Sequence, residues 1–338
     1  MRSAAMEPSV SVLDLLAGKW VSQAISVAAE LSIADELAAG PRAVEDLAAA
    51  CGAHPDSLHR LLRALASVGV FAEDTAGRFA NTGMSESLRS DVPGSMRSMA
   101  LMFGGRPAWD AWGELRESIR TGESAFKAVN GAHAFDYMKG DPKFGRIFGE
   151  AMTAFSAQEL SAIHAAFDFS QVPTLVDVAG GHGAFLLSVL ERNPDQRGIL
   201  FDQPDVIRHA QAALDSSPAA TRCSLVSGDF FVEVPAGDGY VLKHILHDWR
   251  DDLAIKILST IQRAARPGAR LFVIDAVVEP GNTAGFAKLL DLEMLVFYDG
   301  GRERTLAAVE KLFAATGFRL LRVVPTHSLM NVIEAERL

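Results

Sequence analysis

The spacing of apolar residues divides the chain into two parts with different predicted architectures. At 12–37, apolar residues recur at steps of three and four, which predicts one or two helices. Two further helical patterns lie within 44–68, and short apolar segments at 70–72 and 78–80 flank a turn-rich tip, which predicts a hairpin. Two helices at helix-turn-helix spacing followed by a hairpin are typical of a winged helix.

A different pattern follows a mostly helical stretch at 93–169. Beyond it, short apolar strands alternate with helical segments, which predicts a parallel sheet with right-handed crossovers. The predicted strands are Thr174–Val178, 198–201, 223–226, 239–242 and 271–274, with 319–324 and 330–335 completing the sheet. We therefore expect an α/β protein with a winged-helix domain at 1–92, a helical connector at 93–170 and a Rossmann-like domain at 171–338.

Charge and cysteine content narrow the classes of partner. The chain of 338 residues has a formal net charge of -10, and residues 1–100 carry 8 Lys and Arg against 12 Asp and Glu, which disfavours nucleic-acid binding by the winged helix. Cys51 and Cys223 are the only cysteines, so a disulfide framework is not expected. Glu7 and Asp14 interrupt any signal-like segment, and no uncharged apolar run is long enough to span a membrane. We expect a cytoplasmic protein without a membrane span.

The segment 175–183, LVDVAGGHG, is a short apolar strand that leads into a glycine-rich turn, after which 184–190 has helical spacing. A strand, glycine loop and helix in this order are typical of sites for adenosyl cofactors. The dinucleotide pattern is incomplete, because Leu186 stands where a third glycine is required when Gly181 is the first. The candidate cofactor contacts of this loop are Asp177, Gly180 and Gly181.

Acidic residues at two later strand ends support an adenosyl ligand. Asp202, followed by Gln203, lies at about the distance beyond the loop that is expected of an acid bonded to a ribose diol. Asp229 stands beside Phe230, a combination that suits the amino group and ring face of adenine. A solvated turn is the alternative interpretation of Asp229.

His247 is the candidate general base, because imidazole titrates near neutral pH and accepts a proton from a phenol or a similar acidic hydroxyl. Asp275, at the end of the fifth strand, and Glu303, after a flexible Gly300-Gly301, are candidates to orient it. Either acid alone suits an ordinary surface ion pair equally well. No Asp, Glu or Asn cluster has metal-ligand spacing, so we expect no metal requirement.

Aromatic and methionine side chains suggest a planar aromatic substrate, since flexible thioethers adapt to aromatic faces. Most such residues at 93–169 are expected to belong to a core, which is the alternative interpretation of each. The candidate substrate contacts are Met99, Met102, Phe103, Phe148, Met152, Phe155, Asp248, Met294, Phe297 and Tyr298.

Four segments together resemble a known family. They are 176–183, Gly228-Asp229-Phe230-Phe231, Leu242-Lys243-His244-Ile245-Leu246-His247-Asp248-Trp249 and Gly300-Gly301-Arg302-Glu303-Arg304-Thr305. In this order they resemble the motifs of S-adenosylmethionine-dependent small-molecule O-methyltransferases of the caffeate and acetylserotonin type and their bacterial natural-product relatives. The resemblance covers nearly the whole chain and implies a class I methyltransferase sheet preceded by a winged-helix domain that forms a homodimer.

The resemblance also implies roles for individual residues. Gly180 and its neighbours would contact the methionine part of S-adenosylmethionine, Asp202 the ribose, and Asp229 with Phe230 the adenine. Lys243 and His244 would lie at the cofactor's other edge. His247 would be the base, flanked by Asp275 and Glu303, although many relatives carry glutamate where Asp275 stands. The products would be a methylated phenolic hydroxyl and S-adenosylhomocysteine.

Three other functions remain open on the residues alone. Some proteins with this fold have lost methylation and catalyse hydroxylation or decarboxylation instead, so fold does not prove the reaction. A nicotinamide-dependent oxidoreductase needs the same strand, loop and helix. A ligand-sensing transcription regulator uses a winged helix, although the acidic N-terminal part disfavours this function.

Overall fold

The computed structural model describes residues 8–338, which fall into two compact units. The described residues up to Trp109 form unit 1 together with Lys143–Phe155, and Asp110–Pro142 with Ser156–Leu338 form unit 2. Helix α11 (Pro142–Ala166) therefore supplies residues to both units. The expected connector at 93–170 is divided between them, and the boundaries at 92 and 170 stay predictions.

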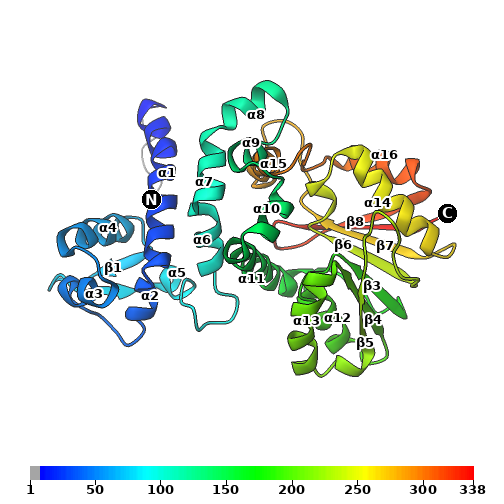
Figure 1. Cartoon of the computed structure of the whole chain (residues 1–338), viewed down its shortest axis with the longest axis horizontal. Coiled ribbons are helices and arrows are strands. Elements are labelled where there is room, and N and C mark those ends of the chain that lie inside the picture. The colour runs from blue at the N-terminus through cyan, green and yellow to red at the C-terminus, as the bar shows by residue number, and fades with distance from the viewer. Residues whose placement is uncertain (1–7) are drawn as a thin grey trace. The chain divides into compact units, whose positions relative to one another are not determined.

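Unit 1 contains the predicted winged helix (Figure 1). Its elements are α1 (Pro8–Glu30), α2 (Ile33–Glu36), α3 (Val44–Cys51), α4 (Pro55–Ser67), β1 (Phe71–Glu73), β2 (Phe79–Asn81), α5 (Gly83–Glu86) and α6 (Arg97–Gly104). The helical pattern at 12–37 becomes two helices, because Ser32 takes a left-handed φ of 56° between them. Leu47, Leu62, Phe71 and Phe79 are fully buried in one core that joins the helices to the antiparallel hairpin.

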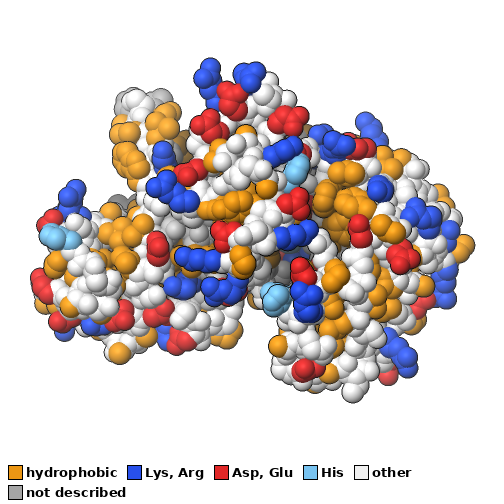
Figure 2. Space-filling model, in the orientation of Figure 1, with side chains coloured by type: hydrophobic (Ala, Val, Ile, Leu, Met, Phe, Trp, Pro, Cys, Tyr) orange, Lys and Arg blue, Asp and Glu red, His pale blue; other side chains and the backbone are white. Residues whose placement is uncertain are grey.

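One face of α1 stays outside this core. Large apolar side chains on it are exposed: Val12 at 55%, Leu15 at 80%, Leu16 at 65% and Trp20 at 69%. Figure 2 shows hydrophobic side chains gathered on the surface at the upper left, where Figure 1 places α1. Within the described part of the chain, Ser9–Glu30 is the one helix long and apolar enough by composition to cross a membrane, with a mean hydropathy of 1.2. Asp14 lies within it, and the expected absence of a span stays a prediction.

Unit 2 is built on a seven-stranded sheet with the order β5-β4-β3-β6-β7-β9-β8. The strands are β3 (Thr174–Val178), β4 (Arg197–Asp202), β5 (Cys223–Ser227), β6 (Gly239–Lys243), β7 (Arg270–Asp275), β8 (Phe318–Pro325) and β9 (Asn331–Arg337). Strands β3 to β7 are parallel, and β9 runs antiparallel to both β7 and β8. All seven predicted strands are confirmed, with ends that differ by at most two residues.

Helices cover the sheet because alternate strand residues on its two faces are apolar. The helices that pack on its strands are α12 (Ala184–Arg192), α13 (Pro204–Ser216), α14 (Asp251–Ala264) and α16 (Leu306–Ala315). Unit 2 also contains α8 (Leu115–Thr121), α9 (Ala125–Asn130), α10 (Ala134–Gly140) and α15 (Ala287–Phe297), and α7 (Arg106–Gly113) is divided between the two units. Val176, Tyr240 and Leu271 pack with the buried residues of α14 and α16. On the other face Phe272 meets Phe169 in an edge-to-face contact with ring centroids 5.3 Å apart.

The topology brings the ends of the parallel strands to one edge. Strand β3 pairs with β4 on one side and with β6 on the other, so the chain connections diverge between β3 and β6. In open parallel sheets, ligands bind beyond the carboxyl ends of the strands at such a switch point. The loops after β3, β4, β5, β6 and β7 carry most of the candidate residues predicted for the cofactor and for catalysis.

Candidate active site

The glycine loop after β3 is tightly folded against the strand ends. Gly183 is the N-cap of α12, and both Gly181 and Gly183 have positive φ, of 60° and 83°. A Cβ on Gly180 would lie 2.5 Å from Asp177 Cγ and from Leu200 Cδ1, so only glycine fits there. Ala179 also has a positive φ, of 59°, although it is not glycine. Its strained backbone belongs to the loop that the sequence predicted to hold a cofactor.

Two carboxyl groups lie beside this loop. Asp202 Oδ2 accepts a hydrogen bond from Gly181 N at 2.9 Å, and Oδ1 accepts one from Gln203 N at 2.6 Å. Burial raises the pKa of Asp202. Burial also raises the pKa of Asp177 to about 7, although the nearby charge of Lys243 opposes the rise. A half-buried backbone cradle and a strand-end acceptor fit an adenosyl group, since a bound ribose diol needs acceptors of this kind.

The predicted adenine contacts lie after β5. Asp229 is exposed and its Oδ1 accepts a hydrogen bond from Phe231 N at 2.8 Å. Phe230 is half-buried and makes edge-to-face contacts with Phe231 at 4.7 Å and Trp249 at 5.8 Å between ring centroids. An exposed carboxylate beside a fixed aromatic ring suits a purine, and this role of Asp229 and Phe230 stays a prediction.

Lys243 is the last residue of β6, His244 follows it, and both are held by the second half of α11. Lys243 Nζ donates to Ser156 Oγ at 2.7 Å and lies 3.1 Å from Glu159 Oε2. His244 Nε2 lies 2.8 Å from the same oxygen of Glu159. Glu159 and Ser156 were not predicted, because a contact between a helix and a strand end more than 80 residues away leaves no spacing pattern along the chain.

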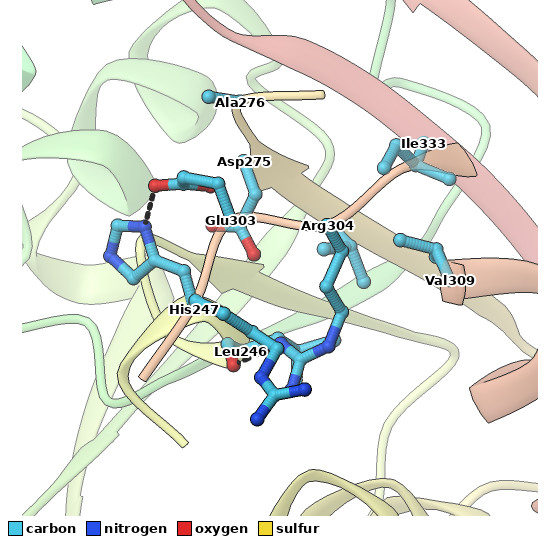
Figure 3. A pocket seen from close by; sticks show the side chains of 10 residues that line it. Leu246, His247, Asp275, Ala276, Glu303, Arg304, Val309 and Ile333 are labelled. Atoms are coloured by element: carbon cyan, nitrogen blue, oxygen red, sulfur yellow. Dashed lines mark hydrogen bonds and ion pairs between the residues drawn. The ribbon is translucent and has the colours of Figure 1, made fainter. Parts of the chain in front are cut away.

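His247 lies in the short turn at Leu246–Asp248 that follows β6. Its side chain is buried, and Nδ1 lies 2.6 Å from Glu303 Oε1, the contact drawn as a dashed line in Figure 3. Asp248 Oδ1 lies 3.5 Å from the other ring nitrogen, Nε2. Asp275, at the end of β7, lies on the same side of the ring as Glu303, and both are buried. The structure therefore brings together the three predicted catalytic residues.

Three carboxyl groups determine the charge of this imidazole. Burial disfavours the protonated ring, but Asp248, Glu303 and Asp275 together outweigh burial and raise the pKa of His247 to about 10. Burial raises the pKa of Asp248 to about 7 and that of Asp275 to about 7, each against the attraction of His247. Such an imidazole is a strong proton acceptor, because the imidazolium is stabilised once it forms.

Arg304 fixes the turn that carries His247, and it was not predicted as a site residue. Its guanidinium is 5% exposed and donates to Leu246 O at 2.5 Å and to Trp249 O at 2.6 Å. It also donates twice to Asp251 Oδ1, at 3.1 and 2.8 Å. Arg304 belongs to the same sequence motif as Glu303, and this motif was the one sequence feature that pointed to it. Its hydrogen bonds to buried backbone carbonyls produce no spacing pattern along the chain.

Replacing Arg304 by methionine is expected to lower the free energy of unfolding by about 2–4 kcal/mol, because two buried carbonyl groups lose their charged donor. Urea denaturation followed by circular dichroism measures the change. Arg266→Met is the matched control, because that side chain is 68% exposed and its ion pair with Asp238 is expected to contribute less than about 1 kcal/mol. Equal losses in the two variants would contradict the role of Arg304 as a clamp.

A small cavity of about 10 Å³ lies behind the imidazole (Figure 3). Its lining includes Asp275, Glu303, Arg304, Val309 and Ile333. It is far too small for an aromatic ring, since sites for such ligands enclose roughly 300–1,000 Å³. An aromatic substrate therefore does not fit inside this cavity.

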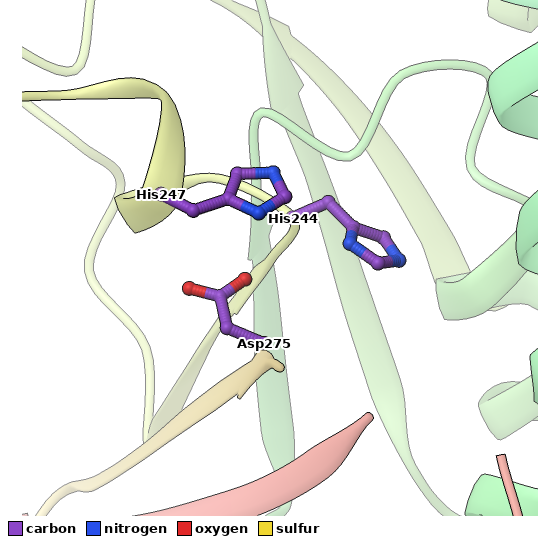
Figure 4. A group of neighbouring side chains, drawn as sticks. All are labelled: His244, His247 and Asp275. Atoms are coloured by element: carbon purple, nitrogen blue, oxygen red, sulfur yellow. The ribbon is translucent and has the colours of Figure 1, made fainter. Parts of the chain in front are cut away.

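His244, His247 and Asp275 lie close to one another (Figure 4). Each offers one potential ligand atom, and the three atoms are within 4.8 Å of one another. Sequence spacing did not indicate this group, because its members come from two strand ends and the turn after one of them. Both histidines already face carboxylates, an arrangement that serves proton transfer as well as it serves a cation. Metal independence stays a prediction.

The predicted substrate contacts are distributed over both units. Unit 1 holds Met99, Met102, Phe103, Phe148, Met152 and Phe155, of which the first two are buried and Phe103 is 38% exposed. Unit 2 holds Asp248, Met294, Phe297 and Tyr298. Within unit 2, the Tyr298 ring stacks on Phe135 at 5.2 Å, and Asp248 faces the Nε2 side of His247. The role of all ten in substrate binding stays a prediction.

Comparisons with known proteins agree with this geometry. An O-methyltransferase domain matches residues 112–319, and an O-methyltransferase dimerisation domain matches residues 13–91. The chain is 42% identical to a phenazine O-methyltransferase of Lysobacter antibioticus over 99% of this chain and 98% of that protein. It is 40% identical to the mitomycin biosynthesis 6-O-methyltransferase of Streptomyces lavendulae over 96% and 92%.

Two further relatives bear on the ligands. A phenazine-1-carboxylate N-methyltransferase of Pseudomonas aeruginosa is 32% identical over 100% of both chains. The crystal structure of an O-methyltransferase from neocarzinostatin biosynthesis, in complex with S-adenosylmethionine and 2-hydroxy-5-methyl naphthoic acid, is similar with a TM-score of 0.80 and 34% identity, covering 94% of this chain and 96% of that chain. The family match, the winged-helix unit and the sheet with its strand-end residues lead to one assignment: this chain belongs to the S-adenosylmethionine-dependent O-methyltransferase family.

Proposed function

We propose that this enzyme methylates a phenolic hydroxyl of a small, planar aromatic natural product, with His247 as the general base. The observation that carries the proposal is the contact between His247 Nδ1 and Glu303 Oε1 at 2.6 Å. A carboxylate on Nδ1 places the ring proton there, so neutral His247 presents the lone pair of Nε2 to the opposite side. Asp248 lies on that side, within 3.5 Å of Nε2.

Different residues of this chain bind the cofactor and move the proton in the proposed reaction. Gly180 and Gly181 present backbone to the cofactor, Asp202 accepts from its ribose, and Lys243 lies at its other edge. When bound, S-adenosylmethionine supplies an electrophilic methyl group. His247 removes the proton of the acceptor hydroxyl, and the oxygen retains the electron pair that would form the new bond to carbon, while the carbon–sulfur bond would break and its electron pair would leave with S-adenosylhomocysteine. Glu303 and Asp275 stabilise the imidazolium that results, so the proton is held at Nε2 until it is released to solvent.

The proposed class of methyl acceptor, a planar aromatic compound, is supported by the names of the relatives and by aromatic side chains of this chain. The relatives' names refer to phenazine, mitomycin and naphthoic acid compounds, which are flat ring systems. In this chain Phe297 and Tyr298 are buried aromatic residues next to the turn at Leu246–Asp248 that carries His247. The test is to offer isotope-labelled S-adenosylmethionine with a panel of phenols, naphthoates, phenazines and polyketides. Labelled product from at least one hydroxylated aromatic compound is expected, and a panel without any labelled product contradicts the proposal.

N-methylation is the second candidate, because a relative that matches the full chain is an N-methyltransferase. A neutral heterocyclic nitrogen already carries the lone pair that attacks the methyl group, so it needs no general base. The His247 and Glu303 pair would then have no proton to remove. Including nonhydroxylated phenazines in the panel separates the two reactions, because only N-methylation proceeds on them.

The raised pKa of His247 predicts how kcat/KM depends on pH. A base must be neutral to accept a proton, so a pKa raised to about 10 places the ascending limb of kcat/KM above neutral pH. Glu303→Gln removes one negative charge that stabilises the imidazolium, so its limb is expected at lower pH than that of the wild type. Rates measured from pH 6 to 10 test this order. A limb at equal or higher pH in Glu303→Gln contradicts the assignment.

We propose that methylation needs no metal, although His244, His247 and Asp275 lie within ligand distance of one another. A cation held between Asp275 and Nδ1 of His247 would leave the ring proton on Nε2, so His247 could not accept a proton there. Treatment with EDTA followed by removal of the chelate is therefore expected to leave the rate unchanged. Loss of methylation that returns when Mg²⁺ or Zn²⁺ is added would refute metal independence.

We propose that the exposed apolar face of α1 forms the homodimer, because the dimerisation domain begins at residue 13 and includes most of that helix. Leu16→Glu places a charge on this face and is expected to give a monomer in light scattering. Val232→Glu, an equal change at a 66% exposed position of unit 2, is expected to stay dimeric. A dimer in both variants excludes this face as the contact.

The cytoplasmic location stays a prediction.

A further inference from the structure

A buried carboxylate on α11 binds two consecutive residues at the end of β6. Glu159 is 2% exposed, and its Oε2 accepts from Lys243 Nζ at 3.1 Å and from His244 Nε2 at 2.8 Å. Ser156, one helical turn earlier, accepts from the same Nζ at 2.7 Å. One turn of helix therefore fixes both the predicted cofactor lysine and the histidine beside the base.

The charges in this cluster determine where the proton of His244 lies. Burial opposes ionisation of Glu159, but His244 and Lys243 outweigh it and lower the pKa of this carboxyl. Burial, together with the charge of Lys243, lowers the pKa of His244 to about 4. An ionised carboxylate only accepts hydrogen bonds, so Nε2 of the neutral ring carries the proton. Nδ1 of His244 is then an acceptor.

That acceptor lies beside the catalytic residues. The rings of His244 and His247 have centroids 5.5 Å apart and are tilted by 32°. Figure 4 shows one nitrogen of His244 on the side of the Asp275 carboxylate, and the other on the far side of the ring. The far nitrogen is Nε2, because it is the one bonded to Glu159. His244 also has a left-handed φ of 55°, a strained conformation that the contact with Glu159 helps to hold.

We propose that Glu159 is a positioning residue that fixes His244 as its Nε2–H tautomer, so that an acceptor and not a donor faces Asp275 and His247. In the opposite tautomer, Nδ1–H would donate to Asp275, whose Oδ1 has no hydrogen-bond partner among the described residues, or to His247 itself. Either bond would compete with the proton transfer that His247 performs. The effect on catalysis rests on the proposed function, whereas the tautomer does not.

Glu159→Leu tests the proposal, because leucine fills a similar space and offers no hydrogen-bond acceptor. Nε2–H of His244 then loses its acceptor on Glu159, and the ring proton moves to Nδ1, where it can donate to Asp275 Oδ1. Nitrogen-15 NMR of histidine-labelled protein bound to S-adenosylhomocysteine is expected to report Nε2–H in the wild type and Nδ1–H in the variant. We expect kcat to fall about tenfold, the effect of one charge-assisted hydrogen bond.

Two further variants complete the experiment. Glu150→Leu makes the same change at an exposed position of the same helix and is expected to alter neither tautomer nor kcat. Glu159→Asp keeps the charge, and it is expected to retain the Nε2–H tautomer and to recover part of the rate if Glu159→Leu folds poorly. Nδ1–H in the wild type, or a lower kcat without a change of tautomer, overturns the proposal. A wild type that transfers no methyl group refutes the proposed function and leaves the NMR result standing.

Discussion

Replacing His247 by asparagine is expected to lower kcat by about 10²–10⁴-fold, the usual contribution of a positioned general base. The amide fills part of the space of the imidazole and still donates toward Glu303, but it accepts no proton from a phenol. The cofactor contacts assigned to Asp202 and Lys243 are unaffected. The affinity for S-adenosylhomocysteine, measured by calorimetry, is therefore expected to stay within about threefold of the wild type, a difference below 1 kcal/mol.

The matched control is His209→Asn, because His209 is exposed on α13 and bonds within its own helix, to Asp205 O at 2.8 Å. It is expected to retain wild-type turnover. If His247→Asn also retains wild-type turnover with saturating acceptor, His247 is not the base. If it loses S-adenosylhomocysteine binding as well, His247 acts on the structure of the cofactor site and not on the proton.

Replacing Gly180 by alanine is expected to weaken the binding of S-adenosylhomocysteine by about 10- to 100-fold. The added Cβ would lie 2.5 Å from Asp177 Cγ and from Leu200 Cδ1, and both neighbours are held at the carboxyl edge of the sheet. Backbone movement is needed to relieve this overlap, and overpacking of this kind costs typically 1–3 kcal/mol. The displaced loop then no longer presents its backbone to the cofactor.

Calorimetric titration with S-adenosylhomocysteine measures this loss, and thermal unfolding shows whether the protein remains folded. Gly113→Ala provides the control, since a Cβ there meets nothing within 4 Å and the residue is exposed at the end of α7. It is expected to bind the cofactor normally. Normal binding by Gly180→Ala would show that this loop is not the cradle.

The sheet was predictable because its strands are short, apolar and separated by clear breaks, and the central strands β3, β6 and β7 are buried on both faces. The same topology explains why the catalytic group was predictable: parallel strands bring their carboxyl ends together, so Asp275 and the segment after β6 had to lie at one edge. Glu303 comes from a later loop. Its position beside His247 was predicted from the family resemblance and because a carboxylate commonly orients a histidine base. In the structure, Glu303 Oε1 lies 2.6 Å from His247 Nδ1.

What the sequence concealed are the buried polar residues that hold the site in place. Glu159 lies in a helix whose pattern is dominated by apolar residues, and Arg304 bonds mainly to backbone carbonyls, whose positions follow from tertiary structure. Neither contact produces a spacing that can be read along the chain. The pKa of His247 was equally hidden, because it depends on three carboxyl groups, of which Asp275 and Glu303 are distant in sequence.

The most direct test of the account locates the transferred methyl group. The protein is incubated with S-adenosylmethionine labelled with carbon-13 in its methyl group and with the best acceptor of the panel, after EDTA treatment, and the product is analysed by mass spectrometry and NMR. We predict one labelled methyl group on a phenolic oxygen, formed by the wild type and at least about 100-fold more slowly by His247→Asn. Label on nitrogen or carbon, or a hydroxylated or decarboxylated product without label, would contradict O-methylation with His247 as its base.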